Sequence, residues 1–196
     1  MSHAINDQAL DTIFRQARSH NKWQEKPVSA ALLMAVYDLM RWGPTSANVS
    51  PARFVFLVSD ETKERIRPYL APGNVEKVMT SAATTIIGYD LGFAEHLPRL
   101  FPHRPDVKTW FADPKIAEIT AFRNGTLQGA YFMIAARALG LDCGPMSGFD
   151  NAGVDREFFA DTPVRSNFLC ALGYGDHSGV FARSPRLSFD EACKIL

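Results

Sequence analysis

A chain of 196 residues, of which 46% are hydrophobic, has the composition of a globular protein, and its 21 basic and 21 acidic side chains give a net charge of zero. This balance excludes the basic surface with which proteins collect nucleic acid phosphates, and the longest apolar run falls short of the ~18 residues of a membrane span. The charged N-terminus lacks the apolar region of a signal peptide. We therefore expect a single domain over residues 1–196 with neither a nucleic acid nor a membrane partner.

The cysteines indicate a reducing compartment. They are three, an odd number, and they stand far apart in the chain, at Cys143, Cys170 and Cys193. The sequence contains no metal-binding pattern such as H-E-x-x-H or C-x-x-C, and no Walker A motif. It therefore predicts a cytoplasmic protein without a metal site.

The N-terminal half of the chain predicts short helices and two strands. After Ser29, a good N-cap residue, apolar side chains recur at helical spacing until the Gly-Pro pair at Gly43. In chain order we expect helices at 7–18 and 30–42, a strand at 54–58, a helix from 60, a turn at 72–74, a helix at 75–81 and a buried strand at 83–90.

The segment between residues 91 and 110 has no clear periodicity. Three prolines, Pro98, Pro102 and Pro105, prevent a long helix. We expect a mobile excursion here, and because the chain is least regular in this segment, we expect it to cover a substrate.

A long helix is expected to begin at Pro114 and to end near Leu139. Its second half, "LQGAYFMIAARALG", is apolar nearly all round, and such a helix has to be covered on every side. One covering surface could be another subunit, because Gly125 and Gly129 lie four residues apart on one face and would admit a partner helix. The alternative is a central core helix of a monomer.

The C-terminal third predicts a strand or loop after the helix stop at Gly140, helical turns at 154–159, a strand at 167–175 and a short helix within 187–196. Helices and strands mix without strict βαβ alternation, and the sequence has no internal repeat. The expected class is therefore α+β, or a mixed α/β sandwich.

Two glycine-containing motifs invite enzyme assignments that their spacing does not support. "GYGDHSG" follows the last expected strand, but its third glycine comes one residue late for a dinucleotide-binding fingerprint and no helix follows. "GPMSGFD" places Ser147 out of register for the nucleophile elbow G-x-S-x-G. We interpret the first as a strand-ending turn and the second as a loop whose glycines let the backbone approach a ligand.

Five polar clusters, separated by hydrophobic elements, remain as candidates for a binding site. They are "RSHNKW" from Arg18, "GPTSANVSP" from Gly43, Gly73-Asn74, "GPMSGF" from Gly144 and "FARSPRL" from Phe181. The cluster from Gly43 is longer than the ~2–6 residues of a plain connector. Two clusters are cationic, which suits phosphate and developing negative charge, and the others offer amides, hydroxyls and glycines, which suit a planar polar ring.

In this order the clusters resemble the FMN-dependent nitroreductase family, over nearly the whole chain. The first motif of the family is a basic R-x-S-x-[RK] stretch and the second is P-S-x-x-N-x-Q-P; their counterparts here are "RSHNK" and "PTSANVSP". More narrowly, "RWGPTSANVSPARFVF", "TAFRNGTLQGAYFMIAARALGLDCGPMSGFD" and "PRLSFDEA" resemble the reductases assigned to malonic semialdehyde in pyrimidine degradation.

The resemblance implies an α+β fold with a mixed central sheet flanked by helices, and an intimate homodimer with FMN at its interface. It implies that the loop residues Pro44, Thr45, Ser46 and Asn48 reach the FMN bound mainly by the other subunit. The residues implied around the phosphate and ribityl chain are Arg18, Ser19 and His20, and a second phosphate contact is implied for either Arg186 or Arg183. Those implied around the ring are Lys22, Asn74, Pro145, Met146, Ser147 and Gly148.

By the same resemblance the chain is an NAD(P)H oxidoreductase with a ping-pong reaction, in which NADH or NADPH delivers a hydride to flavin N5 and a second substrate then removes it. Lys22 is the implied catalytic cation beside the pyrimidine edge of the ring, and Ser147 lies in the implied catalytic loop near N5. Ser147 stands where many family members have glutamate, which weakens the expectation of a nitroaromatic substrate. A broad-specificity quinone or nitro-compound reductase and a non-catalytic flavin-binding protein remain the alternatives.

Overall fold

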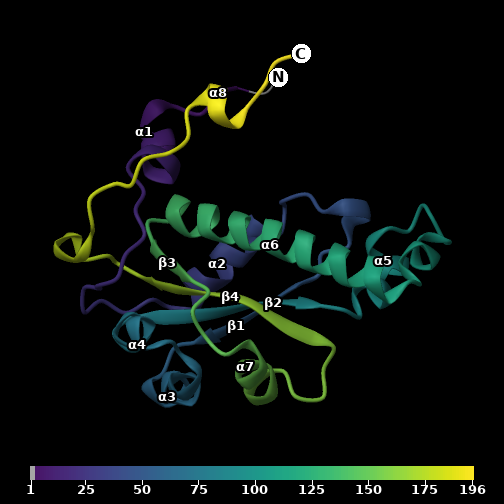
Figure 1. Cartoon of the computed structure of the whole chain (residues 1–196), viewed down its shortest axis with the longest axis horizontal. Helices are drawn as coiled ribbons and strands as arrows, with labels where there is room; N and C mark the ends of the chain where they lie inside the picture. The colour runs from purple at the N-terminus through teal and green to yellow at the C-terminus, as the bar shows by residue number, and fades with distance from the viewer. Residues whose placement is uncertain (1–2) are drawn as a thin grey trace.

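A four-stranded antiparallel sheet forms the centre of the fold, in a computed structural model that describes residues 3–196. Its strand order is β1-β2-β4-β3, and its helices cover both faces (Figure 1). The strands are β1 (Ala52–Leu57), β2 (Ala83–Asp90), β3 (Asp142–Met146) and β4 (Val164–Gly173). This architecture confirms the predicted α+β class and the four predicted strand regions.

The expected mixed sheet is not what the four strands form, because every pair among them is antiparallel. β2 and β3 do run in the same direction, as the long crossover between them predicts, but β4 inserts between the two. Within residues 3–196, a parallel bridge pairs Ser19 with Cys143, at the outer edge of β3, and the other isolated bridges are antiparallel.

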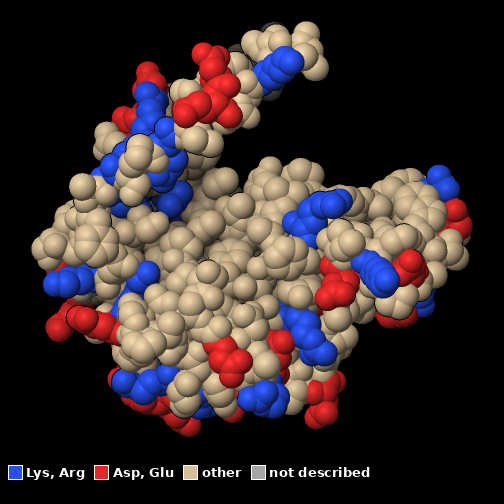
Figure 2. Space-filling model, in the orientation of Figure 1, with Lys and Arg blue, Asp and Glu red and all other residues tan. Residues whose placement is uncertain are grey.

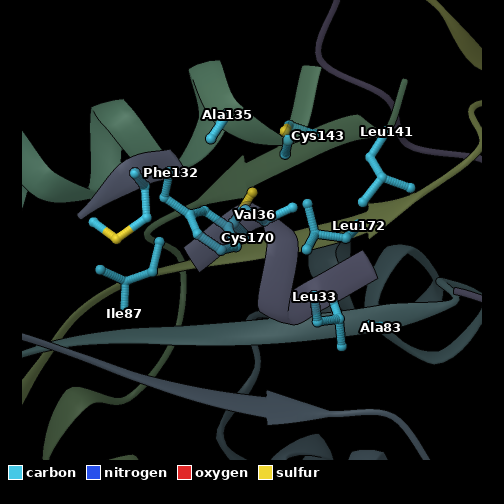
Figure 3. Close-up of a cluster of buried hydrophobic side chains, with 12 residues drawn as sticks. Leu33, Val36, Ala83, Ile87, Phe132, Ala135, Leu141, Cys143, Cys170 and Leu172 are labelled. Atoms are coloured by element: carbon cyan, nitrogen blue, oxygen red, sulfur yellow. The ribbon is translucent and has the colours of Figure 1, made fainter. Parts of the chain in front are cut away.

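Helices α2 (Ala30–Met40) and α6 (Pro114–Ala138) pack together over one face of the sheet. The Ser29 hydroxyl accepts a hydrogen bond from the Leu32 amide at 3.2 Å and caps α2 as predicted. Leu33, Val36 and Met40, at helical spacing, enter a buried cluster with Phe132 of α6 (Figure 3). The sequence-predicted limits of both helices are confirmed to within two residues.

The opposite face of the sheet carries α3 (Asp60–Ile66), α4 (Pro72–Met79) and α7 (Asn151–Phe158), which lie below the sheet in Figure 1. Because both faces are covered, alternate residues of β4 are apolar in both directions: Cys170 and Leu172 face α6, and Leu169 and Ala171 face the other layer. A strand buried on both faces has a continuous apolar sequence, and this apolar run is the feature from which the sequence predicted β4.

The turn predicted at residues 72–74 is wrong, since α4 begins at Pro72. Proline is favoured at the first helical position, where its missing N–H is no loss. Two bonds support this start: the Asn74 amide donates to the Ala71 carbonyl at 2.8 Å, and the Asn74 side chain donates to the carbonyl of Gly148. The tertiary contact was not visible in the sequence.

The excursion predicted at residues 91–110 is regularly folded, and its side chains contribute to a buried cluster. Two 3₁₀ helices (Phe93–His96 and Val107–Phe111) flank α5 (Leu97–Leu100). The cluster consists of Phe93, Leu97, Val107, Val49 and Ala121. The absence of a long helix in this segment is confirmed; its mobility stays a prediction.

The predicted role of the α6 glycines is wrong. A Cβ at Gly125 would lie 2.9 Å from the Cβ of Tyr89, and a Cβ at Gly129 would overlap the ring of Phe168. Both glycines therefore admit the sheet of the same chain and not a partner helix. The most exposed apolar side chains of α6 lie in its first half, where Ile119 and Phe122 are each more than half exposed.

The two ends of the chain extend away from the body together (Figure 1). The N-terminal helix α1 (Asp7–Leu10) continues as one π-helical turn (Asp11–Arg15), and the C-terminal helix α8 is a single turn (Phe189–Ala192). Every residue from 181 to 196 is exposed, including Phe181, Leu187 and Phe189. Over residues 3–196, no helix combines the length and hydropathy needed to cross a bilayer.

Candidate functional site

The basic segment after α1 runs along the outer edge of β3. Ser19 forms the parallel bridge to Cys143, and the His20 amide donates to the Cys143 carbonyl at 3.0 Å. A Cβ at Gly144 would lie 2.6 Å from the His20 carbonyl oxygen. His20 of the first polar cluster and Gly144 of the fourth, 124 positions apart in sequence, are therefore in direct contact, and a glycine is required where they meet.

Lys22 is held on its other side by the chain that follows β4. Its carbonyl accepts a hydrogen bond from the Asp176 amide at 3.0 Å, and its aliphatic stem packs against Gly179. The side chain is exposed. The backbone of Lys22 is thus fixed while its ammonium group remains available to a ligand.

His20 is buried beneath the turn that follows β4. Its Nε2 lies 3.4 Å from Oδ1 of Asp142, its ring meets that of His177 edge-on, and a Cβ at Gly175 would overlap it. Burial lowers the pKa of His20, and the Asp142 carboxylate opposes that shift. Its Nδ1 is buried and has no hydrogen-bond partner within residues 3–196. The burial indicates a structural rather than a ligand-binding imidazole.

The loop after β3 is held by Asn74. The Asn74 side-chain amide donates to the Gly148 carbonyl at 2.9 Å, and the Ala71 amide donates to the same oxygen at 3.0 Å. β3 ends with Pro145 and Met146, and the exposed Ser147 is the first residue of the loop that follows. The structure therefore brings the third and fourth polar clusters together.

Arg18 and Arg183 join the N-terminal segment to the C-terminal stretch. Arg18 donates to the Phe181 carbonyl, and Arg183 donates to the carbonyls of Arg15 at 2.8 Å and Ala17 at 3.2 Å. Figure 2 shows the Lys and Arg side chains gathered where α1 meets this stretch. Arg186 instead donates only to carbonyls one and two residues before it. Of Arg183 and Arg186, Arg183 is therefore the one that contacts the segment just before Arg18.

The loop that joins α2 to β1 lies elsewhere, against α6 and α5. The Ser46 amide donates to Oδ1 of Asn124 at 2.9 Å, and the Asn48 side chain donates to the Leu100 carbonyl at 2.8 Å. Thr45 accepts a bond from the Ser50 amide at 3.1 Å, and Pro44 is exposed. The sequence-predicted residues of this loop thus have defined contacts, but none of these contacts is with the basic segment.

The same loop has a strained backbone. Ala47, Asn48 and Ser50 have φ values of 46°, 52° and 39°, in the left-handed region that non-glycine residues seldom adopt. Three such residues within four positions persist only where the surroundings impose them, and such strain is concentrated at functional sites. This loop is therefore a candidate ligand-binding element in its own right.

The two groups of candidate residues contact α6 at different places, one at its middle and one near its C-terminal end. Asn124 contacts the α2–β1 loop, whereas Arg137 donates to the Ile13 carbonyl at 3.3 Å, just before the basic segment. Thirteen residues of α-helix separate Asn124 from Arg137, which is ~20 Å. Within one chain, the structure brings together the predicted residues of four clusters and leaves those of the α2–β1 loop apart.

Two polar residues of α6 that sequence reasoning missed hold the α2–β1 loop. Asn124 and Gln128 are buried one helical turn apart; Asn124 binds the Ser46 amide, and Gln128 accepts from the Ala52 amide at 2.8 Å. The sequence did carry a signal for them: two amide side chains four residues apart on one face of an otherwise apolar helix. Buried amides need hydrogen-bond partners, so such a pair predicts contacts with another element. Among residues 3–196, no group of three or more His, Cys, Asp or Glu side chains is placed to hold a metal ion.

Comparison with known proteins identifies relatives over almost the whole chain. A family model described as "Nitroreductase family" matches residues 14–175. A relative from Cupriavidus pinatubonensis is 59% identical over 192 residues, covering 96% of this chain and 98% of the relative; one from Ralstonia pickettii, named HadB, is 56% identical over 190 residues, covering 95% and 97%. Both carry the provisional name NADH dehydrogenase/NAD(P)H nitroreductase.

The fold also matches solved structures. A provisional nitroreductase from Exiguobacterium sibiricum, determined in complex with FMN, superposes with a TM-score of 0.85 at 18% identity and covers the full length of both chains. At this identity the likeness establishes the fold alone.

Proposed function

Because the chain belongs to the nitroreductase family, we propose that it is an FMN-dependent NAD(P)H oxidoreductase whose FMN lies between the two subunits of a homodimer. We further propose that residues 1–196 make up one FMN-binding domain. The observation that carries the proposal is the meeting of the basic segment with β3 and its loop, through Ser19–Cys143 on one side and Asn74–Gly148 on the other.

The donor groups of this region fit FMN. Arg18 and Arg183 both bond across the contact between the N-terminal segment and the C-terminal stretch, and guanidinium groups suit a dianionic phosphate. Ser19 and Arg186 complete the proposed phosphate and ribityl region, whereas His20, which the resemblance also implied there, is buried and would only support this region structurally. The exposed ammonium of Lys22 and the loop of Pro145, Met146, Ser147 and Gly148 offer a cation and close backbone approach to a planar ring.

When bound, FMN would supply the hydride chemistry between NAD(P)H and a second substrate. The protein itself would contribute the positioning of FMN and the charges around it. Lys22 would stabilise negative charge at the pyrimidine edge, and Asn74 would hold the Gly148 carbonyl and so the shape of the loop. No side chain of this proposed site is required as a nucleophile, in keeping with the out-of-register Ser147.

Two features support the homodimer. The α2–β1 loop contacts the middle of α6 and the basic segment lies near its C-terminal end, so the residues from Pro44 to Asn48 would meet FMN only across a subunit boundary. Exposed apolar side chains also remain on α2, on the first half of α6 and along the C-terminal stretch, more than isolated surface positions explain. These include Met34, Leu39, Ile119, Phe122, Phe181, Leu187 and Phe189.

Within this class, we propose reduction of malonic semialdehyde to 3-hydroxypropionate, in pyrimidine degradation. The support is the sequence resemblance, together with Ser147 in place of the common glutamate. The unpaired cysteines Cys143, Cys170 and Cys193 favour a reducing cytoplasm. A broad-specificity quinone or nitro-compound reductase is the competing function, since the same flavin machinery serves it.

The test begins with the absorption spectrum of the purified protein. FMN bound at one per chain, bleached by NADH or NADPH without oxygen, is the expected result. Protein that stays colourless after incubation with FMN would exclude the proposal, and flavin that is bound but not bleached would indicate a binding protein. Comparing kcat/KM for malonic semialdehyde, a quinone and a nitroaromatic compound then decides among substrates.

A further inference from the structure

A pocket of about 790 Å³ lies between the C-terminal end of α2, the α2–β1 loop, β1 and α5. It shares Gly43, Pro44, Asn48 and Ser50 with the strained loop. Its aromatic walls come from Tyr37, Trp42, Phe54 and Phe56. A volume of this size and a mixed polar and aromatic lining are typical of small-molecule sites.

The charged side chains that line the pocket are all basic: Arg41, Arg53, Arg99 and His96. The acids nearest to them do not line the pocket but lie beside three of these cations. Asp90 is buried, forms an ion pair with Arg53, and lies 4.0 Å from Nε2 of His96, while Asp38 lies 3.6 Å from Nε of Arg41. The pocket therefore presents cations without a lining carboxylate, which favours an anionic ligand.

Three of the four cations are already engaged. Arg53 is paired with Asp90 and also donates to the Ser50 and Ala52 carbonyls, Arg41 has Asp38 and the face of Trp42, and His96 stands near Asp90. Arg99 differs, because in the part of the chain from residue 3 onward it has neither an ion pair nor a hydrogen bond. It is the guanidinium most available to a ligand.

The backbone at Arg99 is fixed to the loop. The next residue, Leu100, gives its carbonyl to the Asn48 side chain at 2.8 Å, and Leu97 on the same short helix is fully buried. The base of the Arg99 side chain is thus set relative to the strained loop. An arginine whose backbone is fixed and whose guanidinium is free can bind a carboxylate with two parallel hydrogen bonds.

We propose that Arg99 recognises the carboxylate of the second substrate, so that this protein prefers carboxylate-bearing carbonyl or nitro compounds over neutral ones. The inference rests on the proposed function, because that function brings the α2–β1 loop, and with it this pocket, to the FMN of the other subunit. It makes Arg99 a residue that determines specificity and has no part in FMN binding.

The test uses probes that differ in charge but hardly in shape. Binding of benzoate and of benzamide to the FMN-treated full chain is measured by calorimetry, and kcat/KM with NADH is measured for 4-nitrobenzoate and 4-nitrobenzamide. The variant is Arg99→Gln. The matched control is Arg156→Gln, which removes an exposed arginine of α7 outside the pocket.

In Arg99→Gln we expect benzoate affinity and kcat/KM for 4-nitrobenzoate to fall about tenfold, the scale of one charge-assisted contact. The amide probes should change less than about twofold, and Arg156→Gln should leave all four values unchanged. Equal losses for acid and amide, or no loss, would overturn the proposal. The 4-nitrobenzoate assay is repeated with NADPH; a loss seen with NADPH and absent with NADH would also overturn the proposal, by assigning Arg99 to the nucleotide phosphate.

The proposed function can fail separately. If the wild-type chain takes up no FMN, or its flavin is not bleached by NAD(P)H, the oxidoreductase assignment is lost. The benzoate titration still decides whether Arg99 makes this pocket a carboxylate site.

Discussion

The side-chain amide of Asn74 donates a hydrogen bond to the backbone carbonyl of Gly148 at 2.9 Å, and so joins α4 to the loop that follows β3. The resemblance places both residues at the flavin. The geometry gives Asn74 a further role, because the amide that would face a ligand also fixes the loop from Pro145 to Gly148.

Replacing Asn74 by alanine should therefore loosen the loop as well as remove a polar group. We expect the free energy of unfolding to fall by about 1 kcal/mol, the net value of one hydrogen bond, and FMN affinity to fall with it. Asn151→Ala is the matched control, since Asn151 also donates to a backbone carbonyl, that of Ser166 at 3.0 Å, but on α7. The control should lose stability and keep its FMN affinity, as measured by thermal unfolding and flavin fluorescence titration. Unchanged FMN affinity in both variants would contradict the role of Asn74.

Lys22→Met should slow reduction of the bound flavin more than it weakens FMN binding. Methionine keeps the apolar stem that packs on Gly179 and removes the charge. Oxidised flavin is neutral at the ring and the reduced ring is anionic, so the cation acts mainly as charge develops. We expect a roughly tenfold lower rate in anaerobic stopped-flow with NADH at saturating FMN, the low end of the range for a charge-assisted contact because the side chain is exposed.

Lys115→Met, on the first turn of α6, serves as the control for this experiment and should match the wild type. A Lys22 variant that loses FMN affinity and reduction rate by the same factor would show that Lys22 acts in binding only.

His20 should make stability depend on pH. Its pKa is lowered in the folded protein by burial, so the folded state disfavours the imidazolium that the unfolded chain forms below the ordinary value of 6.5. The stability present above that value is therefore lost as the pH falls from 6.5 toward the lowered folded pKa. Comparing the unfolding free energy at several pH values in wild type and His20→Gln measures the effect. The loss over this window should be smaller in the variant; equal curves would exclude His20 as the source.

Phe122→Lys should weaken the homodimer. Phe122 is 51% exposed on the first half of α6, stacked edge-on against Tyr89, and a charge in an apolar interface is costly unless it is paired. We expect sedimentation to show a shift toward monomer with a parallel loss of FMN, because the proposed site needs both subunits. Val58→Lys, which places the same charge at an exposed apolar position beyond the end of β1, should remain a dimer that binds FMN. A wild-type chain that is monomeric with FMN bound would remove the basis of this prediction.

The sequence by itself determined the elements whose signals are local. Ser29 caps α2, Ser59 caps α3, Pro114 opens α6, and the apolar run of residues 83–90 forms β2 with the predicted limits. Each depends on capping, proline geometry or apolar periodicity, which act within a few residues. The five polar clusters were visible for a related reason, since hydrogen-bonding residues stand out between apolar elements.

Only the tertiary structure decided how those parts meet. Insertion of β4 between β2 and β3 makes the sheet antiparallel, and contacts with Tyr89 and Phe168 turn Gly125 and Gly129 toward that sheet and away from any partner. The bonds of Asn74 to Gly148 and of Arg183 to Ala17 join residues 74 and 166 positions apart. Burial and pairing at that separation depend on the packing of the whole chain, so no local pattern could identify the buried His20 or the unpaired Arg99 in advance.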